Sequence, residues 1–280
     1  MVAYPHIDPV LIHIGPLQIR WYGLMYVLGF IACYLLVKIQ SKKFGLKNLQ
    51  AHLDNLNLAI ILGVILGGRL GYVLFYNPAY YLRHPLEIFA TWQGGMSFHG
   101  GCIGVLMAGF YVCRKHGLDY WKTADLFVVT VPIGLALGRI GNFINGELYG
   151  RVTSLPWGMI FPEGGLVPRH PSQLYEAFLE GVVLFVILWN LKEKPWQRQH
   201  PWPHGSLVAL FLCLYGLFRF LVEFVREPDP QLGLFFLDLS MGQLLSIAMF
   251  LAGIILFLIR KKASSPPGQR KRGPCGKKAR

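Results

Sequence analysis

Long apolar windows recur seven times along the 280-residue chain, and they constrain its fold more than any other feature. A helix needs about 20 mostly apolar residues to cross the ~30 Å hydrocarbon core of a bilayer. Because lipid offers the backbone no hydrogen-bond partners, helices are the expected spanning structures. The windows that we interpret as spans are residues 16–37, 56–76, 94–113, 124–144, 172–191, 205–225 and 240–260.

The amount and position of charge agree with a membrane protein. Only 15% of the residues are charged, against about 25% in soluble proteins. A net charge of +13 would suggest nucleic acid as the partner of a soluble protein, but here the basic residues lie between spans and in the tail. We therefore expect no nucleic-acid partner and predict an all-α integral membrane protein with seven transmembrane helices. Glycines at four-residue spacing favour close helix packing: Gly63, Gly67 and Gly71, Gly100 and Gly104, and Gly134 and Gly138.

The distribution of Lys and Arg predicts the orientation, because short cytoplasmic loops carry more of them. Most of the 27 lie in alternate loops and in the C-terminal tail, whereas only Arg83, Arg151, Arg169 and Arg226 fall on the other side. The N-terminus is thus expected outside and the C-terminus in the cytoplasm. We expect a transmembrane catalytic domain over residues 1–260, a small periplasmic cap at about 145–171, and a disordered basic tail over 261–280.

Four arginines, Arg20, Arg69, Arg139 and Arg219, fall inside the predicted spans. Such a residue costs about 2.5–3.5 kcal/mol on insertion scales and is a functional hypothesis by default. In the predicted orientation all four lie near the outer ends of their spans. Arginines that face one cavity at that depth would bind the phosphate of a lipid headgroup by paired hydrogen bonds.

Structural alternatives stay open for the single residues. Arg20 can snorkel to the interface, and Arg69 can tie to a nearby carboxylate or carbonyl. Arg219 can pair with Glu223 one turn away. The remaining alternatives are hydrogen bonding between helices for Asn142 and Asn145, a satisfied buried imidazole for His99, interfacial anchoring for Tyr22, Tyr72 and Tyr76, and structural pairing for Asp125 and Glu176.

The polar stretch GRIGNFINGELYG at 138–150 is part of a set of short motifs. The others are RWYGLMY (20–26), GGRLGYVLFYN (67–77), GGMSFHGG (94–101), RHPSQLYEAFLEG (169–181) and YGLFRFLVEFVREPD (215–229). Over residues 6–260 this set resembles bacterial prolipoprotein diacylglyceryl transferases. The resemblance implies a seven-span inner-membrane enzyme that moves the diacylglyceryl group of phosphatidylglycerol onto the lipobox cysteine of a preprolipoprotein, the first step of lipoprotein maturation. It implies no metal and no organic cofactor.

The residue types fit such a reaction. A thiol needs a base or a positive field to become the reactive thiolate, and His99 is the candidate base. Arg139 and Arg219 are the candidates for stabilising the phosphate leaving group. We expect Glu147 and Glu223 to orient the arginines. The full set of expected substrate-binding residues is Tyr22, Tyr72, Tyr76, Asn142, Asn145, Glu147, Gly150, His170 and Glu223.

Other functions fit the sequence less well. A lipid or anion transporter needs polar residues along its whole path, but the inner halves of the spans carry almost none apart from Asp125. An intramembrane protease needs a Ser/His or paired Asp arrangement within the spans, and neither is evident. A seven-span receptor would rest on the number of helices alone.

Overall fold

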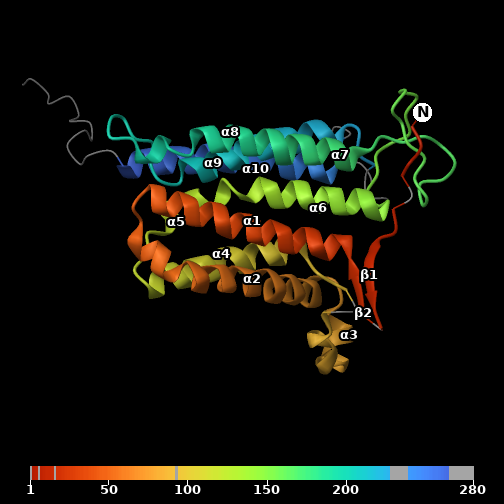
Figure 1. The fold of residues 1–280 in the computed structure, drawn as a ribbon, viewed down its shortest axis with the longest axis horizontal. Coiled ribbons are helices and arrows are strands. Elements are labelled where there is room, and N and C mark those ends of the chain that lie inside the picture. Colours follow the sequence, from red (N-terminus) through yellow and green to blue (C-terminus); the bar gives the residue numbers. More distant parts are fainter. Residues whose placement is uncertain (1, 6, 16, 92–93, 228–238, 265–280) are drawn as a thin grey trace, which may run out of the picture. The chain divides into compact units, whose positions relative to one another are not determined.

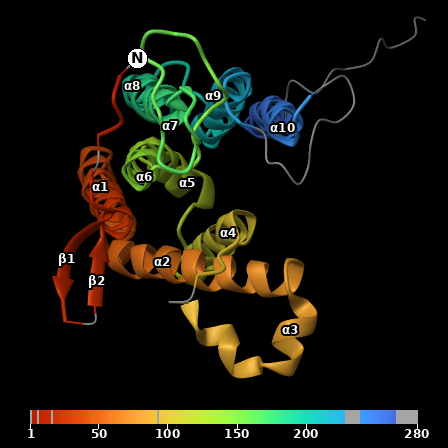
Figure 2. The same ribbon diagram turned by 90° about the vertical axis from the view of Figure 1, so that its right-hand side faces the viewer.

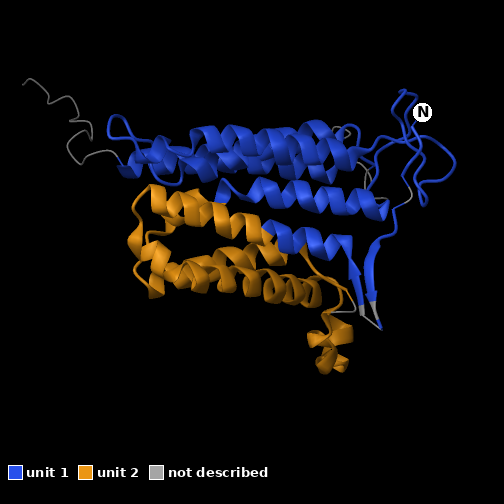
Figure 3. Cartoon of the chain, viewed as in Figure 1, with its two compact units in different colours: residues 1–29, 128–280 blue, residues 30–127 orange. Residues whose placement is uncertain are grey.

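The computed structural model describes residues 2–5, 7–15, 17–91, 94–227 and 239–264. The chain divides into two compact units, one of residues 1–29 and 128–280 and the other of residues 30–127 (Figure 3). Each unit is described by itself. Helices make up most of both, which confirms the predicted helical class.

Within the described part of the chain, six helical stretches are long and apolar enough to cross a membrane: Trp21–Lys43, Lys47–Phe75, Tyr120–Asn145, Ser172–Trp196, Ser206–Glu223 and Met241–Ser264. Each overlaps one predicted span. The predicted span 94–113 corresponds to helix α4 (Phe98–Lys115), which is not among the six. The seventh crossing therefore stays a prediction.

The N-terminal region contains a feature that the sequence prediction missed. Strands β1 (Val10–Ile14) and β2 (Leu17–Arg20) form an antiparallel hairpin directly before helix α1 (Trp21–Lys43). The first span consequently begins at Trp21, not at residue 16. The prediction that Arg20 lies inside a span is wrong, because Arg20 ends a strand and is exposed.

In the unit of residues 30–127, helices α2 (Lys47–Phe75) and α4 pack side by side through their glycines (Figure 2). A Cβ atom at Gly63 would lie 2.6 Å from the carbonyl oxygen of Gly104, and one at Gly71 would lie 2.8 Å from the Cα of Gly100. Those distances leave no room for any side chain. The predicted role in close packing is confirmed for the glycines of α2 and α4, but it is wrong for Gly138, where a Cβ atom would meet nothing within 4 Å.

Arg69 is a structural tie in the same unit. Its buried guanidinium donates hydrogen bonds to the carbonyls of Glu87, Ile88, Gly94 and Gly95 at 2.6–3.2 Å. These bonds hold the segment after α2, with the short helices α3 (Pro78–Arg83) and η1 (Pro85–Phe89), against α2. Of the two alternatives left open for Arg69, the structure supports the carbonyl tie.

The other unit contains α6 (Val131–Asn145), α7 (Ser172–Glu176), the π-helical segment η3 (Ala177–Val183), α8 (Leu184–Leu191), α9 (Ser206–Glu223) and α10 (Met241–Ser264) (Figure 1). Buried Val128, Val129, Leu184, Leu188 and Leu207 form its apolar core. Helix α5 (Tyr120–Val128) precedes α6, and Pro132 in the first turn of α6 suits a new helix start.

The segment between α6 and α7 begins and ends where the predicted cap does. Isolated β-bridges tie it together and to flanking residues, among them Val152 to Arg169 and Gly150 to Arg226. Beyond α10 the prediction of a disordered tail is wrong for residues 261–264, which are helical, because α10 continues to Ser264. Residues 265–280 of that predicted tail lie outside the described residues.

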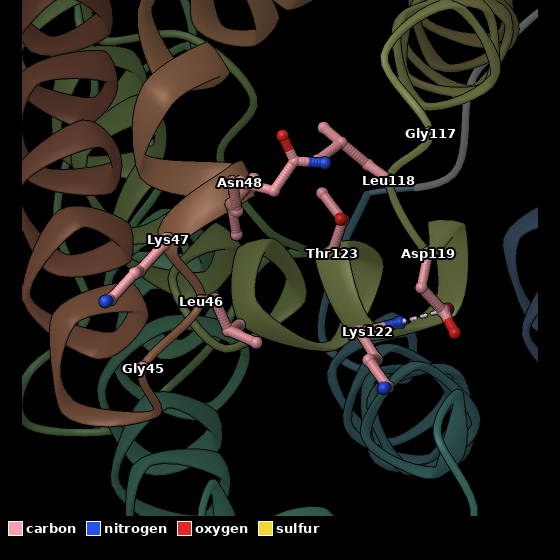
Figure 4. Close-up of a pocket in the computed structure, with 10 residues that line it drawn as sticks. Gly45, Leu46, Lys47, Asn48, Gly117, Leu118, Asp119, Lys122 and Thr123 are labelled. Carbon is pink, nitrogen blue, oxygen red and sulfur yellow. Dashed lines mark hydrogen bonds between the residues drawn. The ribbon is translucent and has the colours of Figure 1, made fainter.

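A shallow cavity of about 270 Å³ opens in the unit of residues 30–127, where α2 and α5 begin (Figure 4). Its lining comes from residues 45–49, 117–119, 122 and 123. Asp119 faces this space and accepts a hydrogen bond from the backbone N–H of Lys122 at 3.0 Å, as an N-terminal cap does. None of the candidate site residues lines the cavity.

Candidate active site

Three arginines and three glutamates form a buried cluster in the unit of residues 128–280. Arg139 comes from α6, Arg219 and Glu223 come from α9, and Arg226 follows α9. Glu176 ends α7, and Glu180 lies in η3. The sequence prediction had named Arg139, Arg219 and Glu223 as site residues, and the structure brings them together.

Glu176 is the centre of the cluster. Its Oε2 atom lies 2.6 Å from Nε of Arg139 and 3.1 Å from Nη1 of Arg219, and its Oε1 atom lies 3.9 Å from Nε of Arg226. Like charges repel strongly in a low-dielectric interior, so three guanidinium groups need a shared anion to stay together. Glu176 supplies it, which supports the structural pairing considered for this residue.

Arg219 is enclosed by carboxylates. Its Nη2 atom lies 2.8 Å from Oε2 of Glu223, one turn along α9, so the i,i+4 pair considered from the sequence is present. Ser240 donates a hydrogen bond to the other Glu223 oxygen at 3.0 Å. Glu223 thus orients Arg219 as expected.

A π-helical segment shapes the other side of the cluster. Segment η3 begins directly after Glu176 and carries Glu180. Gly181 packs its backbone onto Ala136 of α6, leaving no space for a Cβ atom. Because π-helical turns often mark functional sites, this close approach is consistent with a site at the carboxylates.

The ion contacts of Glu176 are not aligned hydrogen bonds. Both of its carboxylate oxygens are buried, and neither accepts a hydrogen bond within the described ranges, despite the 2.6 Å distance to Arg139. The side chain of Arg139 is 21% exposed, whereas those of Arg219 and Arg226 are 12% and 13% exposed. Arg139 is therefore the most accessible of the three arginines.

The amides of the GRIGNFINGELYG stretch surround Glu147. Asn142 and Asn145 donate hydrogen bonds to its Oε1 atom at 2.8 and 3.1 Å. Arg139 reaches the Asn142 oxygen at 3.5 Å. Among the described contacts Glu147 holds the two amides, and Asn142 connects it to Arg139, so it can orient that arginine through Asn142.

Gly146 explains how this stretch leaves the helix. It caps α6 with a left-handed conformation at φ 70°, and its N–H bonds to the carbonyls of Asn142 and Phe143. A glycine adopts that conformation without the strain that a Cβ atom would bring. The turn directs Glu147 back towards the amides. Gln173 at the start of α7 fixes it further by donating to the Glu147 carbonyl at 2.6 Å.

Tyr22 belongs to the same unit. Its ring lies against Gly141 of α6, where a Cβ atom would come within 2.9 Å of the ring. Its hydroxyl is 3.1 Å from that of Tyr26. Tyr22 also interacts electrostatically with Arg139 and Glu147, which places it beside the predicted headgroup residues.

Gly150 and His170 lie together beyond the helices. The N–H of Gly150 donates to the His170 carbonyl at 2.8 Å, and a Cβ atom at Gly150 would come within 2.7 Å of the His170 Cβ. The ring of His170 lies 3.3 Å from the Tyr175 hydroxyl. Burial lowers the pKa of His170 below its ordinary value, so its ring is neutral at pH 7.

His99, Tyr72 and Tyr76 belong to the other unit. His99 is exposed near the start of α4, and its ring makes an edge contact with Phe98 at 5.8 Å. Tyr72 and Tyr76 stack at 5.3 Å on the last turns of α2, and Tyr76 is 64% exposed. Exposure does not fit the alternative of a satisfied buried imidazole for His99.

Glu180 and Arg226 were not among the predicted site residues. Glu180 could have been found, because an acidic residue four positions after Glu176 in an apolar span needs a partner. Arg226 was counted as a loop charge, since it follows the end of a span. Among the described residues there is no group of three or more His, Cys, Asp and Glu side chains that could hold a metal.

Comparison with known proteins shows the family of the chain. The profile of the family described as prolipoprotein diacylglyceryl transferase matches residues 9–259. A phosphatidylglycerol–prolipoprotein diacylglyceryl transferase of Desulfotalea psychrophila is 59% identical over 256 residues, 91% of this chain and 94% of the relative. One from Geobacter sulfurreducens is 55% identical over 95% of this chain and its own full length, and one from Bordetella avium is 52% identical over 95% and 99%. The chain belongs to the prolipoprotein diacylglyceryl transferase family.

Proposed function

We propose that this protein transfers the sn-1,2-diacylglyceryl group of phosphatidylglycerol to the thiol of a lipobox cysteine in preprolipoproteins. The sulfur–carbon bond of a thioether forms, and the carbon–oxygen bond to the phosphate breaks. Glycerol phosphate leaves, and the thiol's proton balances its new charge. The printed names of the relatives support the two substrates, and the lipobox follows from the motif resemblance.

The observation that carries this proposal is the convergence of Arg139, Arg219 and Arg226 on Glu176. Arginine keeps its charge on burial and matches the geometry of phosphate oxygens. Arg139 contacts Glu176 through Nε and is the most exposed of the three arginines. We assign phosphate binding to Arg139 first, with Arg219 adding positive potential behind it.

The remaining residues have supporting roles in this proposal. Asn142 and Asn145, which donate to Glu147, lie beside the headgroup, and Tyr22 packs against Gly141 of the same helix. His99 accepts or positions the thiol proton, because an exposed imidazole is available to an incoming peptide. Tyr72 and Tyr76 contact the lipid, and Gly150 and His170 shape the border of the site.

The cellular setting is also a proposal. We place the protein in the bacterial inner membrane with its N-terminus in the periplasm and its C-terminus in the cytoplasm, as the bias of Lys and Arg indicates. In that orientation the segment between α6 and α7 is a periplasmic cap. The charged cluster then faces the outer leaflet, where a secreted lipobox peptide is available.

One assay tests the function. The purified full-length protein is incubated with phosphatidylglycerol vesicles and a lipobox peptide, and the mass of the peptide is measured by mass spectrometry. We expect a diacylglyceryl thioether and free glycerol phosphate. If the peptide stays unmodified while lipid moves between the leaflets, the protein is a lipid transporter and the proposed enzyme activity is wrong. A Cys→Ser lipobox peptide is the matched control, since it offers no thiol.

A further inference from the structure

Glu180 has no role in the proposed reaction, although it is the most deeply buried carboxyl group of the cluster. Its side chain is 0% exposed, and its Oε1 atom lies 3.8 Å from Nη1 of Arg219. Neither of its oxygens has a hydrogen-bond partner in the described part of the chain. Glu223 has a closer arginine and a serine hydroxyl, so Glu180 is the less well compensated of these two carboxyls.

The charges of the cluster cancel when all six side chains are ionised. Arg139, Arg219 and Arg226 carry three positive charges, and Glu176, Glu180 and Glu223 carry up to three negative charges. The phosphodiester of phosphatidylglycerol adds one negative charge to this low-dielectric region. An uncompensated buried charge is costly, and neutralising one carboxylate would keep the region balanced as the lipid enters.

We propose that Glu180 takes up one proton when the anionic headgroup binds, and that it releases this proton when glycerol phosphate leaves. The inference rests on the proposed function, because it needs a phosphate beside Arg139. Glu180 is a positioning residue in this scheme: it touches no reacting atom and acts through Arg219. Once Glu180 is neutral, one carboxylate fewer offsets the positive charge of Arg219, so the attraction between Arg219 and the phosphate is stronger.

The surroundings of Glu180 single it out for this role. The charged and titratable groups that act on it are Glu176 on α7, Arg139 on α6, Arg219 and Tyr215 on α9, and Arg226 after α9. Glu176 has contacts with all three arginines, and Glu223 accepts a hydrogen bond from Ser240. Neutralising either would leave more positive charge unpaired than neutralising Glu180 does.

Lipid kinetics test the inference. The KM for phosphatidylglycerol is measured with the full-length protein at saturating lipobox peptide, between pH 6 and pH 9. For the parent protein we expect the KM to rise with pH, approaching about tenfold per pH unit for one coupled proton. Glu180→Gln should give a low KM that is independent of pH, because the amide is neutral throughout. Glu180→Asp should keep the slope.

A matched control separates this effect from the loss of any nearby carboxylate. Glu227 is 44% exposed and pairs with Arg169 at 2.9 Å, outside the six-residue cluster. Glu227→Gln should keep the activity of the parent and its full pH slope. A slope that persists in Glu180→Gln, or a flat profile in the parent, overturns the role of Glu180.

Direct proton counting keeps the test decisive if Glu180→Gln does not fold. The parent protein is mixed with phosphatidylglycerol vesicles in weak buffer without peptide, and a pH dye reports the protons taken up. We expect up to about one proton per bound headgroup, depending on the starting pH. Phosphatidylcholine vesicles, whose headgroup is net neutral, should cause no uptake. No uptake with phosphatidylglycerol at any pH between 6 and 9 overturns the inference.

The two proposals fail in different ways. If the parent protein forms no thioether from phosphatidylglycerol, the proposed function fails and the inference fails with it. If thioether forms and Arg139→Ala abolishes it, while the pH slope of the KM is the same in the parent and in Glu180→Gln, only the role of Glu180 is wrong.

Discussion

The Nε atom of Arg139 lies 2.6 Å from the Oε2 atom of Glu176, and this contact joins helix α6 to helix α7 at the centre of the buried cluster. Arg139 is partly exposed, whereas Glu176 is almost fully buried. The pair therefore combines a buried anion with a guanidinium that stays partly exposed. The stability of the fold depends on it, and so does the binding of phosphate in the proposed function.

Glu176→Gln should lower stability and activity together. Removing the carboxylate leaves three arginines without their common partner, and breaking a buried pair in this way costs roughly 3–5 kcal/mol. Thermal unfolding in detergent measures the first effect and thioether formation the second. An unchanged melting temperature would mean that water or lipid already compensates these arginines.

Arg139→Lys should fold but work poorly. The ammonium keeps the charge near Glu176 but cannot form two parallel hydrogen bonds to phosphate. The loss of one charge-assisted hydrogen bond, about 1.5–3 kcal/mol, corresponds to a fall of roughly 10- to 150-fold in kcat/KM for phosphatidylglycerol. Activity equal to that of the parent would show that Arg139 acts only as a point charge.

The sequence was sufficient to predict where most helices lie, because a span needs a long apolar run whatever its neighbours are. It could not predict the β1–β2 hairpin, since Leu17–Arg20 is apolar enough to be read as the start of the next helix. The pairing of Val10 with Arg20 depends on contacts that no local pattern encodes.

Part of the site could also be predicted from the long apolar runs. Arg139 and Arg219 stand out because charge in an apolar span is rare. The sequence could not show that Glu176 pairs with both of them. Glu176 lies on another helix, and the position of that helix depends on the packing of Gly181 against Ala136. The direct partners of Glu147 could not be predicted either, because the left-handed cap at Gly146 turns it towards Asn142 and Asn145.

His99→Ala should lower kcat without changing stability. The side chain is exposed and makes no hydrogen bond that the structure describes, so its removal leaves no buried group unpaired. General-base catalysis contributes typically about 10²- to 10⁴-fold, and a loss in this range is expected at pH 7. The measurement is kcat at saturating peptide over a range of pH. A near-parental rate would assign thiol activation to the positive field of the arginines.

Two substitutions at Glu147 should differ. Glu147→Gln keeps an oxygen that can accept hydrogen bonds from Asn142 and Asn145, so we expect at least a tenth of the parental kcat/KM. Glu147→Ala leaves the buried Asn142 amide without its acceptor, at a cost of about 1–3 kcal/mol. Unfolding midpoints and thioether assays on both variants measure the difference. Equal loss in both would mean that the charge of Glu147 matters, not its hydrogen bonds.

Gly150→Ala should destabilise the border of the site for a steric reason. A methyl group there would overlap the carbonyl oxygen of Val225 and come within 2.7 Å of the His170 Cβ, and both neighbours belong to backbone-bonded segments. Overpacking of this kind costs typically about 1–3 kcal/mol, and here it would also displace Arg226, which pairs with Gly150 in a β-bridge.

Gly138→Ala is the matched control from the same motif, because a Cβ atom at Gly138 meets nothing within 4 Å. We expect Gly150→Ala to lose both melting temperature and activity, whereas Gly138→Ala keeps both. If Gly150→Ala were stable but inactive, Gly150 would act by leaving room for the substrate instead of for His170.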